Sequence, residues 1–360
     1  MSSGNSTLVQ EPSRPDETSA SKAFTQLPPH IAAAVADFKS KGHKWTPDYK
    51  PGSEDEKTRA VFAAYATNDE PDNRDEEQDP WKFEIVNGLF RQSHADSNKL
   101  TPEQMLETGF GLLDETPDRW AKFKASVEKL QREAPDNVKY KVMFCGRHGQ
   151  GWHNFAAAKY DPVTWELDLT KRNGDGEVVW GPDAELTPLG EKQALTVQEG
   201  WKRNLALGAP LPEVWFCSPL TRTAETMRLS FGDILEGKTP IFVEAFREIF
   251  GEHTCDKRRT KVIVSLKSYL QERYPTYKFE PGFAEEDPWW KPDERELEAN
   301  RRERLRNAMF KLFDENDQTY ISLTSHSCAL RSLLTVLHHR PYSLETGEMI
   351  PVIVKATKQN

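Results

Sequence analysis

The chain has 360 residues, of which 37% are hydrophobic and 29% are charged, and its formal net charge at pH 7 is −9. This length suits one large α/β domain with insertions, or two ordinary domains. The acidic balance argues against general nucleic-acid binding, which needs a basic face, and no stretch approaches the roughly 18 apolar residues of a membrane helix. We therefore expect no nucleic-acid partner and no membrane partner.

The first twenty residues lack the basic start and the apolar run of a secretory signal. The four cysteines are far apart in the chain and form no CxxC pair. This spacing predicts neither a disulfide framework nor a zinc site. We expect an intracellular protein that is cytoplasmic, or both cytoplasmic and nuclear.

The first 80 residues differ in composition from the rest of the chain. Residues 1–25 are polar and contain serine and proline, and residues 47–80 are acidic and proline-rich. Between them, apolar residues recur at helical spacing and predict a short helix at 29–41. We therefore divide the chain into a largely disordered N-terminal extension, 1–80, and a folded domain, 81–360.

From residue 81 onward, short apolar strands alternate with helical segments. Strands are predicted at 81–93 (a strand or an extended clamp), 140–145, 213–217, 241–243, 320–324 and 348–356, the last at an edge of the sheet. Helices are predicted at 117–134, 186–208, 221–231, 259–274, 292–315 and 328–339. Repeated β-then-α units predict a three-layer α/β/α sandwich around a mostly parallel central sheet.

The helix predicted at 186–208 has recognisable ends. Thr187 is a suitable N-cap, Pro188 suits the first helical position, and Gly208 follows the last periodic residue. These three residues predict where that helix begins and ends.

Polar residues gather where the predicted strands end. In open α/β sheets, ligands bind beyond the carboxyl ends of the strands. The residues that follow four of the strands are, in chain order, Arg147 and His148, Arg222, Arg247 and Glu248, and His326. Arginines neutralise a phosphoryl group, a neutral histidine can attack phosphorus, and a second histidine can donate to the equatorial oxygens. A carboxylic acid can protonate the leaving oxygen, so this set of side chains favours a phosphate site.

Four motifs carry a family resemblance. The segments RHGQGWHN, CSPLTRTAET, FREIFG and TSHS resemble, in that order, the motifs of the histidine phosphatase superfamily, also called the phosphoglycerate mutase-like family. The resemblance covers about residues 139–341. The segments HTCDKRR and EEDPWWKPD look similar to a fungal and plant subgroup of cofactor-independent, phosphatase-like members.

The resemblance implies roles for individual residues. His148 matches the nucleophile that forms a phosphohistidine, and Glu248 best matches the proton donor, with Asp183 and Glu244 as alternatives. The residues that match the phosphate pocket are Arg147, Asn154, Arg222 and His326. Gly149 and Gly151 would let the backbone approach the phosphate closely. The resemblance implies no cofactor and no metal, because the arginines carry the compensating charge.

The departures from the family pattern bear on the reaction. Mutases of the superfamily usually carry Glu-Ser after the Arg-His-Gly triplet, where this chain has Gln150-Gly151. The segment around Glu248 also lacks the tyrosine-glycine pattern of mutases. We therefore expect a phosphomonoesterase that acts on a small phosphorylated metabolite. The alternatives are a phosphomutase of the same fold, and a catalytically weak binding or regulatory protein that uses its acidic N-terminal part for docking.

Several residues near these motifs allow two interpretations each. His153 could contact substrate or simply pack on its helix. His253 and Cys255 are two isolated ligands, which do not make a metal site. Arg258 and Arg259 could contact a charged substrate or belong to a solvated basic turn.

Overall fold

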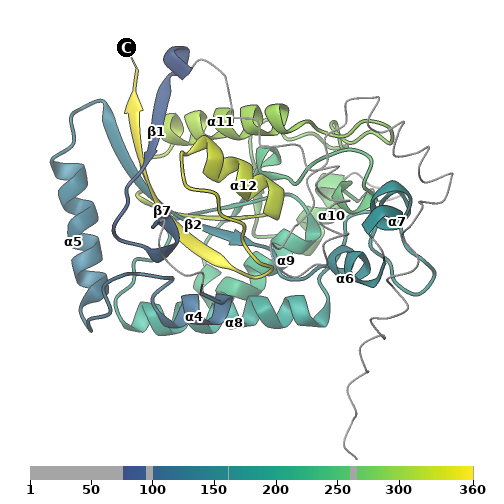
Figure 1. The fold of residues 1–360 in the computed structure, drawn as a ribbon, viewed down its shortest axis with the longest axis horizontal. Coiled ribbons are helices and arrows are strands. Elements are labelled where there is room, and N and C mark those ends of the chain that lie inside the picture. The colour runs from purple at the N-terminus through teal and green to yellow at the C-terminus, as the bar shows by residue number, and fades with distance from the viewer. Residues whose placement is uncertain (1–75, 95–99, 161, 260–265, 360) are drawn as a thin grey trace, which may run out of the picture. The chain divides into compact units, whose positions relative to one another are not determined.

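The computed structural model describes residues 76–94, 100–160, 162–259 and 266–359, so the helix predicted at 29–41 and most of the N-terminal extension lie outside it. A seven-stranded sheet in the order β1-β7-β2-β6-β3-β4-β5 has helices on both sides (Figure 1). This arrangement confirms the predicted α/β/α sandwich. The strands are β1 Trp81–Ile85, β2 Val138–Arg147, β3 Val214–Cys217, β4 Ile241–Phe242, β5 Lys278–Phe279, β6 Tyr320–Ser325 and β7 Met349–Lys358.

The helices fill the two outer layers. They are α4 Pro102–Glu107, α5 Arg119–Arg132, α6 Trp152–Lys159, α7 Pro162–Leu167, α8 Pro188–Ala206, α9 Thr221–Phe231, α10 Leu266–Arg273, α11 Glu298–Glu315 and α12 Ser327–Val336. Short 3-10 turns are η1 Glu76–Gln78, η2 Arg91–Ser93, η3 Leu169–Lys171, η4 Gly232–Leu235, η5 Glu244–Phe246 and η6 Thr254–Asp256. In Figure 1, α11 and α12 lie on one side of the sheet and α4 and α8 on the other.

The sheet is mostly parallel, as predicted. Strands β2, β6, β3, β4 and β5 pair in parallel, and β7 and β1 add two antiparallel pairings. Successive side chains of β2 enter two different cores. Met143 and Cys145 pack with residues of α11 and α12, whereas Val142 and Phe144 pack with residues of α5, α8 and α9. This alternation explains why residues 142–145, which lie between two helical layers, are all apolar.

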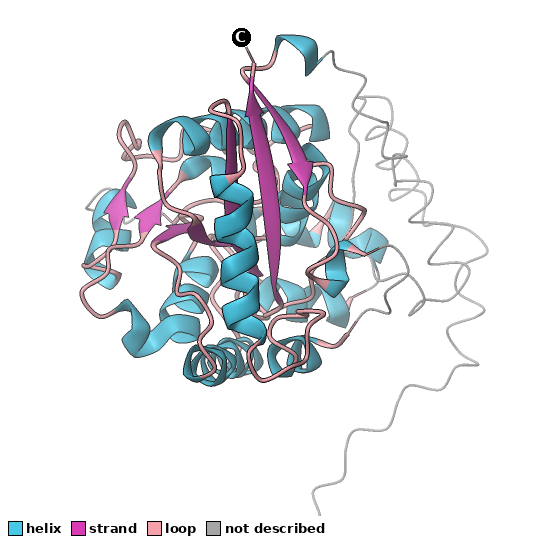
Figure 2. Cartoon of the chain, turned by 90° about the vertical axis from the view of Figure 1, so that its left-hand side faces the viewer, coloured by secondary structure: helices cyan, strands magenta, loops and turns pink. Residues whose placement is uncertain are grey.

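The prediction that the last strand lies at an edge is wrong. β7 lies between β1 and β2, with a strand on either side (Figure 2). β1 pairs with β7 only from Trp81↔Lys358 to Ile85↔Val354. Pro351 lies beyond this register, so its missing N–H removes no hydrogen bond to β1. The Pro351 carbonyl there accepts a hydrogen bond from Gln92 Nε2 at 2.7 Å.

The boundaries of two predicted helices can be compared with the structure. α8 begins at Pro188 with Thr187 as its N-cap, since Thr187 Oγ1 accepts from Gly190 N at 3.1 Å. Gly208 follows the helix with φ of +89°, which confirms the predicted C-terminal signal. The helix predicted at 292–315 instead begins at Glu298, because Leu297 has an extended backbone and acts as N-cap.

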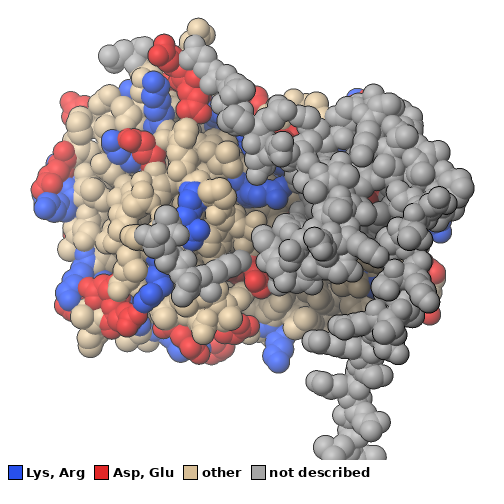
Figure 3. Space-filling view, viewed as in Figure 1, with Lys and Arg blue, Asp and Glu red and all other residues tan. Residues whose placement is uncertain are grey.

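Charged side chains of both signs are interspersed over the described surface in Figure 3. Within the described ranges, the structure contains no helix that is both long enough and apolar enough to span a membrane.

Candidate active site

The end of β2 forms the floor of the candidate site. β2 pairs in parallel with β6, so that Arg147 lies opposite Ser325, and His148 N donates to Ser325 O at 3.1 Å. His148 follows the end of β2 and His326 follows the end of β6, so a histidine stands directly after each of these two strands. The ring centroids of His148 and His326 lie 5.1 Å apart. Parallel register thus brings together two of the predicted site residues that are far apart in the chain.

The protonation state of His148 follows from its surroundings. Its side chain is 2% exposed, and Nδ1 lies 2.7 Å from the carbonyl oxygen of Gly149. A carbonyl oxygen only accepts hydrogen bonds, so Nδ1 carries the proton and Nε2 keeps the lone pair. Burial, and then the charges of Arg222 and Arg147, hold the pKa of His148 well below its usual value. His148 is therefore neutral at pH 7, as a nucleophile requires.

The second histidine is held by a serine that the sequence analysis did not single out. His326 Nε2 lies 2.7 Å from Ser218 Oγ, and both residues are fully buried. His326 Nδ1 is buried and has no hydrogen-bond partner in the part of the chain that the structure describes. Burial and the charge of Arg222 lower the pKa of His326. Ser218 is the first residue after β3, and this position was the available signal for it.

The two predicted phosphate-binding arginines are buried next to the histidines. Arg222 is in the first turn of α9, and its Nε is buried without a hydrogen-bond partner among the described residues. Its Nη1 donates to Cys255 O at 2.7 Å, and its Nη2 donates to Asp256 Oδ1 at 2.8 Å. Arg147 Nη1 donates to Leu344 O at 2.9 Å. Both positive charges act on the pKa of His148 and His326, so the two arginines lie close to the two histidines.

Glu248 lies beside the helix that follows His326. Its Oε2 accepts from Cys328 N at 3.1 Å, and its Oε1 accepts from Ile249 N at 3.0 Å. Cys328 is in the first turn of α12, for which His326 is the N-cap. Ser325 Oγ donates to Phe246 O at 2.7 Å, which joins the end of β6 to the segment that carries Glu248.

The two alternative carboxylates are engaged elsewhere. Glu244 Oε1 lies 2.8 Å from Arg247 Nη1. The Asp183 oxygens accept from Thr221 N at 2.8 Å and from Thr221 Oγ1 at 2.5 Å. Asp183 thereby satisfies the first N–H of α9, and burial raises its pKa. Glu248 thus lies at the start of the helix that follows His326, whereas Asp183 lies at the start of the helix that carries Arg222.

The turn after His148 brings a third histidine, His153, next to His148. Asn154 Oδ1 accepts from Gly151 N at 2.9 Å, which leaves the Asn154 amino group to donate. The His153 ring lies 5.4 Å from the His148 ring, and its Nδ1 is buried without a partner among the described residues. A Cβ on Gly151 would lie 2.6 Å from His153 Nδ1, so glycine leaves the space that His153 occupies.

Gly149 has a packing role that the sequence did not reveal. A Cβ on Gly149 would lie 2.2 Å from Gly190 O, and a Cβ on Gly190 would lie 2.1 Å from Gln150 O. The two glycines therefore let the turn after β2 pack directly on the first turn of α8. This contact explains Gly149 without the close approach to phosphate that the sequence analysis expected.

A group of potential metal ligands occurs at η6. One ligand atom each of His253, Cys255 and Asp256 lie within 4.8 Å of one another. However, His253 Nε2 already lies 2.9 Å from Glu166 Oε1, and Asp256 pairs with two arginines. A cation there would be next to two guanidinium groups, so this group fits an ion-pair network better than a metal site.

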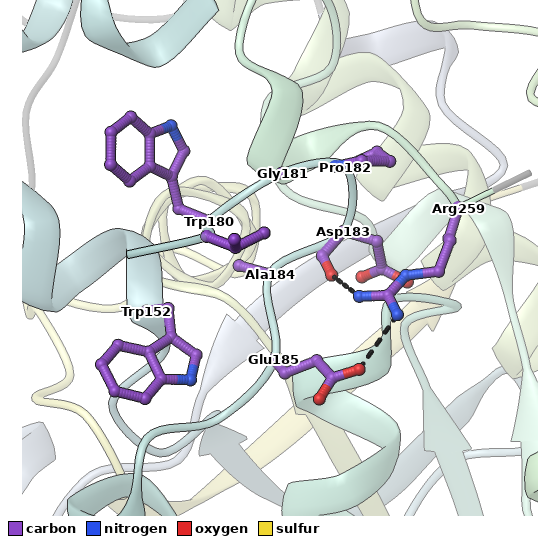
Figure 4. A pocket seen from close by; sticks show the side chains of 9 residues that line it. Trp152, Trp180, Gly181, Pro182, Asp183, Ala184, Glu185 and Arg259 are labelled. Atoms are coloured by element: carbon purple, nitrogen blue, oxygen red, sulfur yellow. Dashed lines mark hydrogen bonds and ion pairs between the residues drawn. The ribbon is translucent and has the colours of Figure 1, made fainter. Parts of the chain in front are cut away.

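A pocket of about 260 Å³ lies near the start of α6 (Figure 4). Trp152 and the segment 179–185 form its walls together with Arg259, which bonds to Glu185 Oε1 at 3.0 Å and to Asp183 O at 3.1 Å. Arg258 is instead only 1% exposed, and its guanidinium carbon lies 4.5 Å from the centre of the Phe283 ring. The interpretation of Arg258 as part of a solvated turn is therefore wrong.

Comparison with known proteins gives one matching family and several similar proteins. The model of the histidine phosphatase superfamily (branch 1) matches residues 169–349, a range that begins after His148 and includes Arg222, Glu248 and His326. The chain is 36% identical over 289 residues to a "Probable phosphoglycerate mutase" of Arthroderma benhamiae, covering 76% of this chain and 84% of that protein.

Two further similarities extend the comparison. A "Probable phosphoglycerate mutase" of Saccharomyces cerevisiae is 33% identical over 249 residues, covering 63% of this chain and 84% of that protein. Among solved structures, a phosphoserine phosphatase from Entamoeba histolytica, in complex with 3-phosphoglyceric acid, gives a TM-score of 0.33 at 21% identity, covering 58% of this chain and 88% of that chain.

Proposed function

Since the chain belongs to the histidine phosphatase superfamily, we propose that it is a phosphomonoesterase that hydrolyses a small phosphorylated metabolite through a phosphohistidine on His148. The observation that carries this proposal is the hydrogen bond from His148 Nδ1 to Gly149 O at 2.7 Å. This bond orients the imidazole and leaves the Nε2 lone pair for attack on phosphorus. The depressed pKa of His148 keeps that lone pair available at neutral pH.

In the first proposed step, His148 Nε2 bonds to phosphorus while the bond from phosphorus to the ester oxygen breaks. Arg147 and Arg222 neutralise the phosphoryl oxygens. When the Ser218 hydroxyl donates a hydrogen bond to His326 Nε2, the buried Nδ1 of His326 carries the proton and donates to one of these oxygens. Glu248 in its protonated form donates a proton to the departing alkoxide. Asn154 adds a donor through its amino group.

In the second proposed step, the oxygen of a water molecule bonds to phosphorus while the bond from phosphorus to His148 Nε2 breaks. Glu248, now a carboxylate, removes a proton from that water. Inorganic phosphate leaves and His148 returns to its neutral form. The buried arginines supply positive charge at the phosphoryl group, and we therefore expect turnover without a metal ion.

A phosphomutase is the second candidate, because the two relatives described above carry the name phosphoglycerate mutase. A mutase would use the same phosphohistidine but pass the phosphoryl group to a second hydroxyl before water reaches it. The Gln150-Gly151 pair is the feature of this chain that favours hydrolysis, since mutases of the superfamily usually carry Glu-Ser at that place.

The test is hydrolysis of p-nitrophenyl phosphate by the purified full chain, with a chelator present. We expect wild type to release phosphate and His148→Ala to release none. His339→Ala is the matched control, because His339 is also buried but bonds to Ser93, outside the site. Loss of activity on chelation would contradict the expected metal independence.

Trapping of the intermediate separates the candidates. The proposal predicts acid-labile, base-stable phosphate on wild type but not on His148→Ala, and rapid loss of this phosphate to water. A phosphohistidine that is stable in water but transferred to added monophosphoglycerate would favour the mutase. Absence of both turnover and phosphohistidine across a panel of metabolites would favour a binding protein.

A further inference from the structure

Arg222 donates two hydrogen bonds to one short turn. Its Nη1 donates to the backbone oxygen of Cys255 at 2.7 Å, and its Nη2 donates to the carboxylate of Asp256 at 2.8 Å. The two acceptors come from neighbouring residues at the end of η6, within the HTCDKRR segment, to which the proposed mechanism assigns no role. Two acceptors at adjacent nitrogens fix the plane of a guanidinium group, not merely its position.

Asp256 is itself fixed in a buried position. It is 4% exposed, and its second oxygen, Oδ2, lies 3.3 Å from Arg295 Nη1. Arg295 Nη1 also donates to Gly251 O at 2.8 Å, which ties it to the same loop. Burial raises the pKa of Asp256, but the charges of Arg222 and Arg295 outweigh burial and hold the pKa below its usual value. Asp256 is therefore a carboxylate between two guanidinium groups.

The two hydrogen bonds to η6 do not use every donor of Arg222. Its Nε is buried and has no hydrogen-bond partner among the described residues. The charge of Arg222 also lowers the pKa of His148 and of His326, so Arg222 lies near both histidines. A buried donor without a partner costs free energy unless a ligand satisfies it.

We infer that Asp256 is a positioning residue of the phosphate site, which holds Arg222 so that its remaining donors meet a bound phosphoryl group. The inference rests on the proposed function, in which Arg222 binds phosphate. The proton and the phosphoryl group do not pass through Asp256. Its contribution is to set the orientation of Arg222 before substrate arrives, and misplacement of such a group by about 1 Å can cost 10²-fold in rate.

The experiment measures binding of inorganic phosphate to the full chain by calorimetry, together with kcat/KM for p-nitrophenyl phosphate. Asp256→Asn keeps the shape of the side chain but removes its charge. Asp256→Glu keeps the charge but moves the carboxylate by one methylene group. If orientation matters, both variants should bind phosphate roughly 10- to 100-fold more weakly than wild type.

A double-mutant cycle tests the route of the effect. Asp256→Asn should have no further effect once Arg222 is replaced, so Asp256→Asn/Arg222→Ala should match Arg222→Ala to within about twofold. Asp79→Asn is the matched control. Asp79 is 4% exposed, like Asp256, and its Oδ2 lies 3.5 Å from Arg306 Nε of α11. This control should lower the melting temperature but change phosphate affinity by no more than about twofold.

Three results would overturn the inference. The first is a phosphate affinity of Asp256→Asn and Asp256→Glu equal to that of wild type. The second is that the effects of Asp256→Asn and Arg222→Ala simply add. The third is an equal loss of affinity in Asp79→Asn. A chain that binds phosphate with the expected pattern but releases none from the ester would contradict the proposed hydrolysis and support the role of Asp256. A chain that hydrolyses the ester equally well with and without Asp256 would overturn only the role of Asp256.

Discussion

At the scale of single residues, the site combines groups that are costly to bury. His148 is 2% exposed and His326 is fully buried, and both lie near the charges of Arg147 and Arg222. Two effects therefore act in the same direction, since burial and nearby positive charge both disfavour the imidazolium form. The result is two imidazoles that stay neutral under conditions in which an exposed histidine would begin to protonate.

This arrangement makes the stability of the protein depend on pH. The pKa of His148 and His326 is lower in the folded state than the value of about 6.5 in the unfolded chain, so the unfolded state binds more protons below that pH. The free energy of unfolding should therefore fall as the pH drops below about 6.5, by roughly 1.4 kcal/mol per pH unit for each histidine. Above that pH the two groups contribute no slope.

Urea unfolding between pH 6.5 and 5.5 measures this slope. His326→Asn removes one of the two groups, so its change in unfolding free energy over this pH unit should be smaller than that of wild type by about 1 kcal/mol, since histidine in the unfolded chain is only partly protonated near pH 6.5. Taking the difference cancels the contributions of the carboxylates, which both proteins share. Identical slopes would show that His326 protonates in the folded state.

The identity of the proton donor can be tested with leaving groups. Glu248→Gln should lower kcat/KM for an alkyl phosphate by roughly 10²- to 10⁴-fold, because an alkoxide needs a proton to depart. The loss for p-nitrophenyl phosphate should be much smaller, because p-nitrophenolate leaves readily without one. Asp183→Asn and Glu244→Gln should affect both esters alike, since these residues hold Thr221 and Arg247. A loss that depends on the leaving group in either control would move the assignment away from Glu248.

At the scale of elements, the site depends on close contact between the turn after β2 and the start of α8. Gly149 and Gly190 face each other there, and Gly149 N donates to Thr226 Oγ1 of α9 at 3.0 Å. The turn is thus fixed by two helices of the same layer. Because His148 immediately precedes this turn, we expect the packing of α8 to influence the orientation of the proposed nucleophile.

Gly190→Ala should therefore reduce both stability and activity. Its Cβ would meet the backbone oxygen of Gln150, which cannot rotate away, at a cost of roughly 1–3 kcal/mol in the free energy of unfolding. Displacement of the turn should lower kcat/KM by roughly 10- to 100-fold. The measurements are urea unfolding and ester hydrolysis.

Gly200→Ala is the control for this prediction, in the same helix. Its Cβ would lie 2.7 Å from Leu106 Cδ2 and 3.0 Å from Leu106 Cβ, so this variant also crowds a buried contact, but at α4 and not at the turn that carries His148. We expect kcat/KM close to that of wild type. Equal losses of activity in the two variants would show that the Gly149–Gly190 contact has no particular importance.

At the scale of the whole described domain, the sheet is completed by a strand that precedes the catalytic motifs by more than fifty residues. Trp81 and Phe83 of β1 are 2% and 5% exposed and pack on Phe313 of α11, with ring centroids 5.7 Å and 5.5 Å apart. β1 also covers part of the outer edge of β7. β1 therefore belongs to the same hydrophobic core as β7, the last strand of the chain.

Phe83→Ala should lower the free energy of unfolding by roughly 3–5 kcal/mol, because it removes a large side chain from this core. Lys82→Ala changes the exposed neighbour in the same strand and should cost no more than about 0.5 kcal/mol. Urea unfolding gives both values. Similar midpoints for the two variants would mean that β1 is not an integral part of the core.

Much of this molecule could be predicted from local patterns. The strand periods, the caps of α8 and the polar residues after each strand are short-range signals, and they predicted the α/β class and the parallel sheet. They also indicated which residues meet, because parallel strands place their carboxyl ends at one edge. That rule is the reason His148 and His326 could be associated from sequence, although nearly 180 residues separate them.

Other features depended on contacts that no local pattern contains. Segments that are remote in sequence meet in each of these features. They are the interior position of β7, the hydrogen bond between Ser218 and His326, the ion pair between Asp256 and Arg222, and the contact between Gly149 and Gly190. Strand order and side-chain pairing across a core depend on which surfaces bury each other, and many pairings satisfy the same local preferences. The sequence by itself thus determined the kinds of element and the chemistry at their ends. Only the tertiary structure decided which neighbouring residues orient the side chains at those ends.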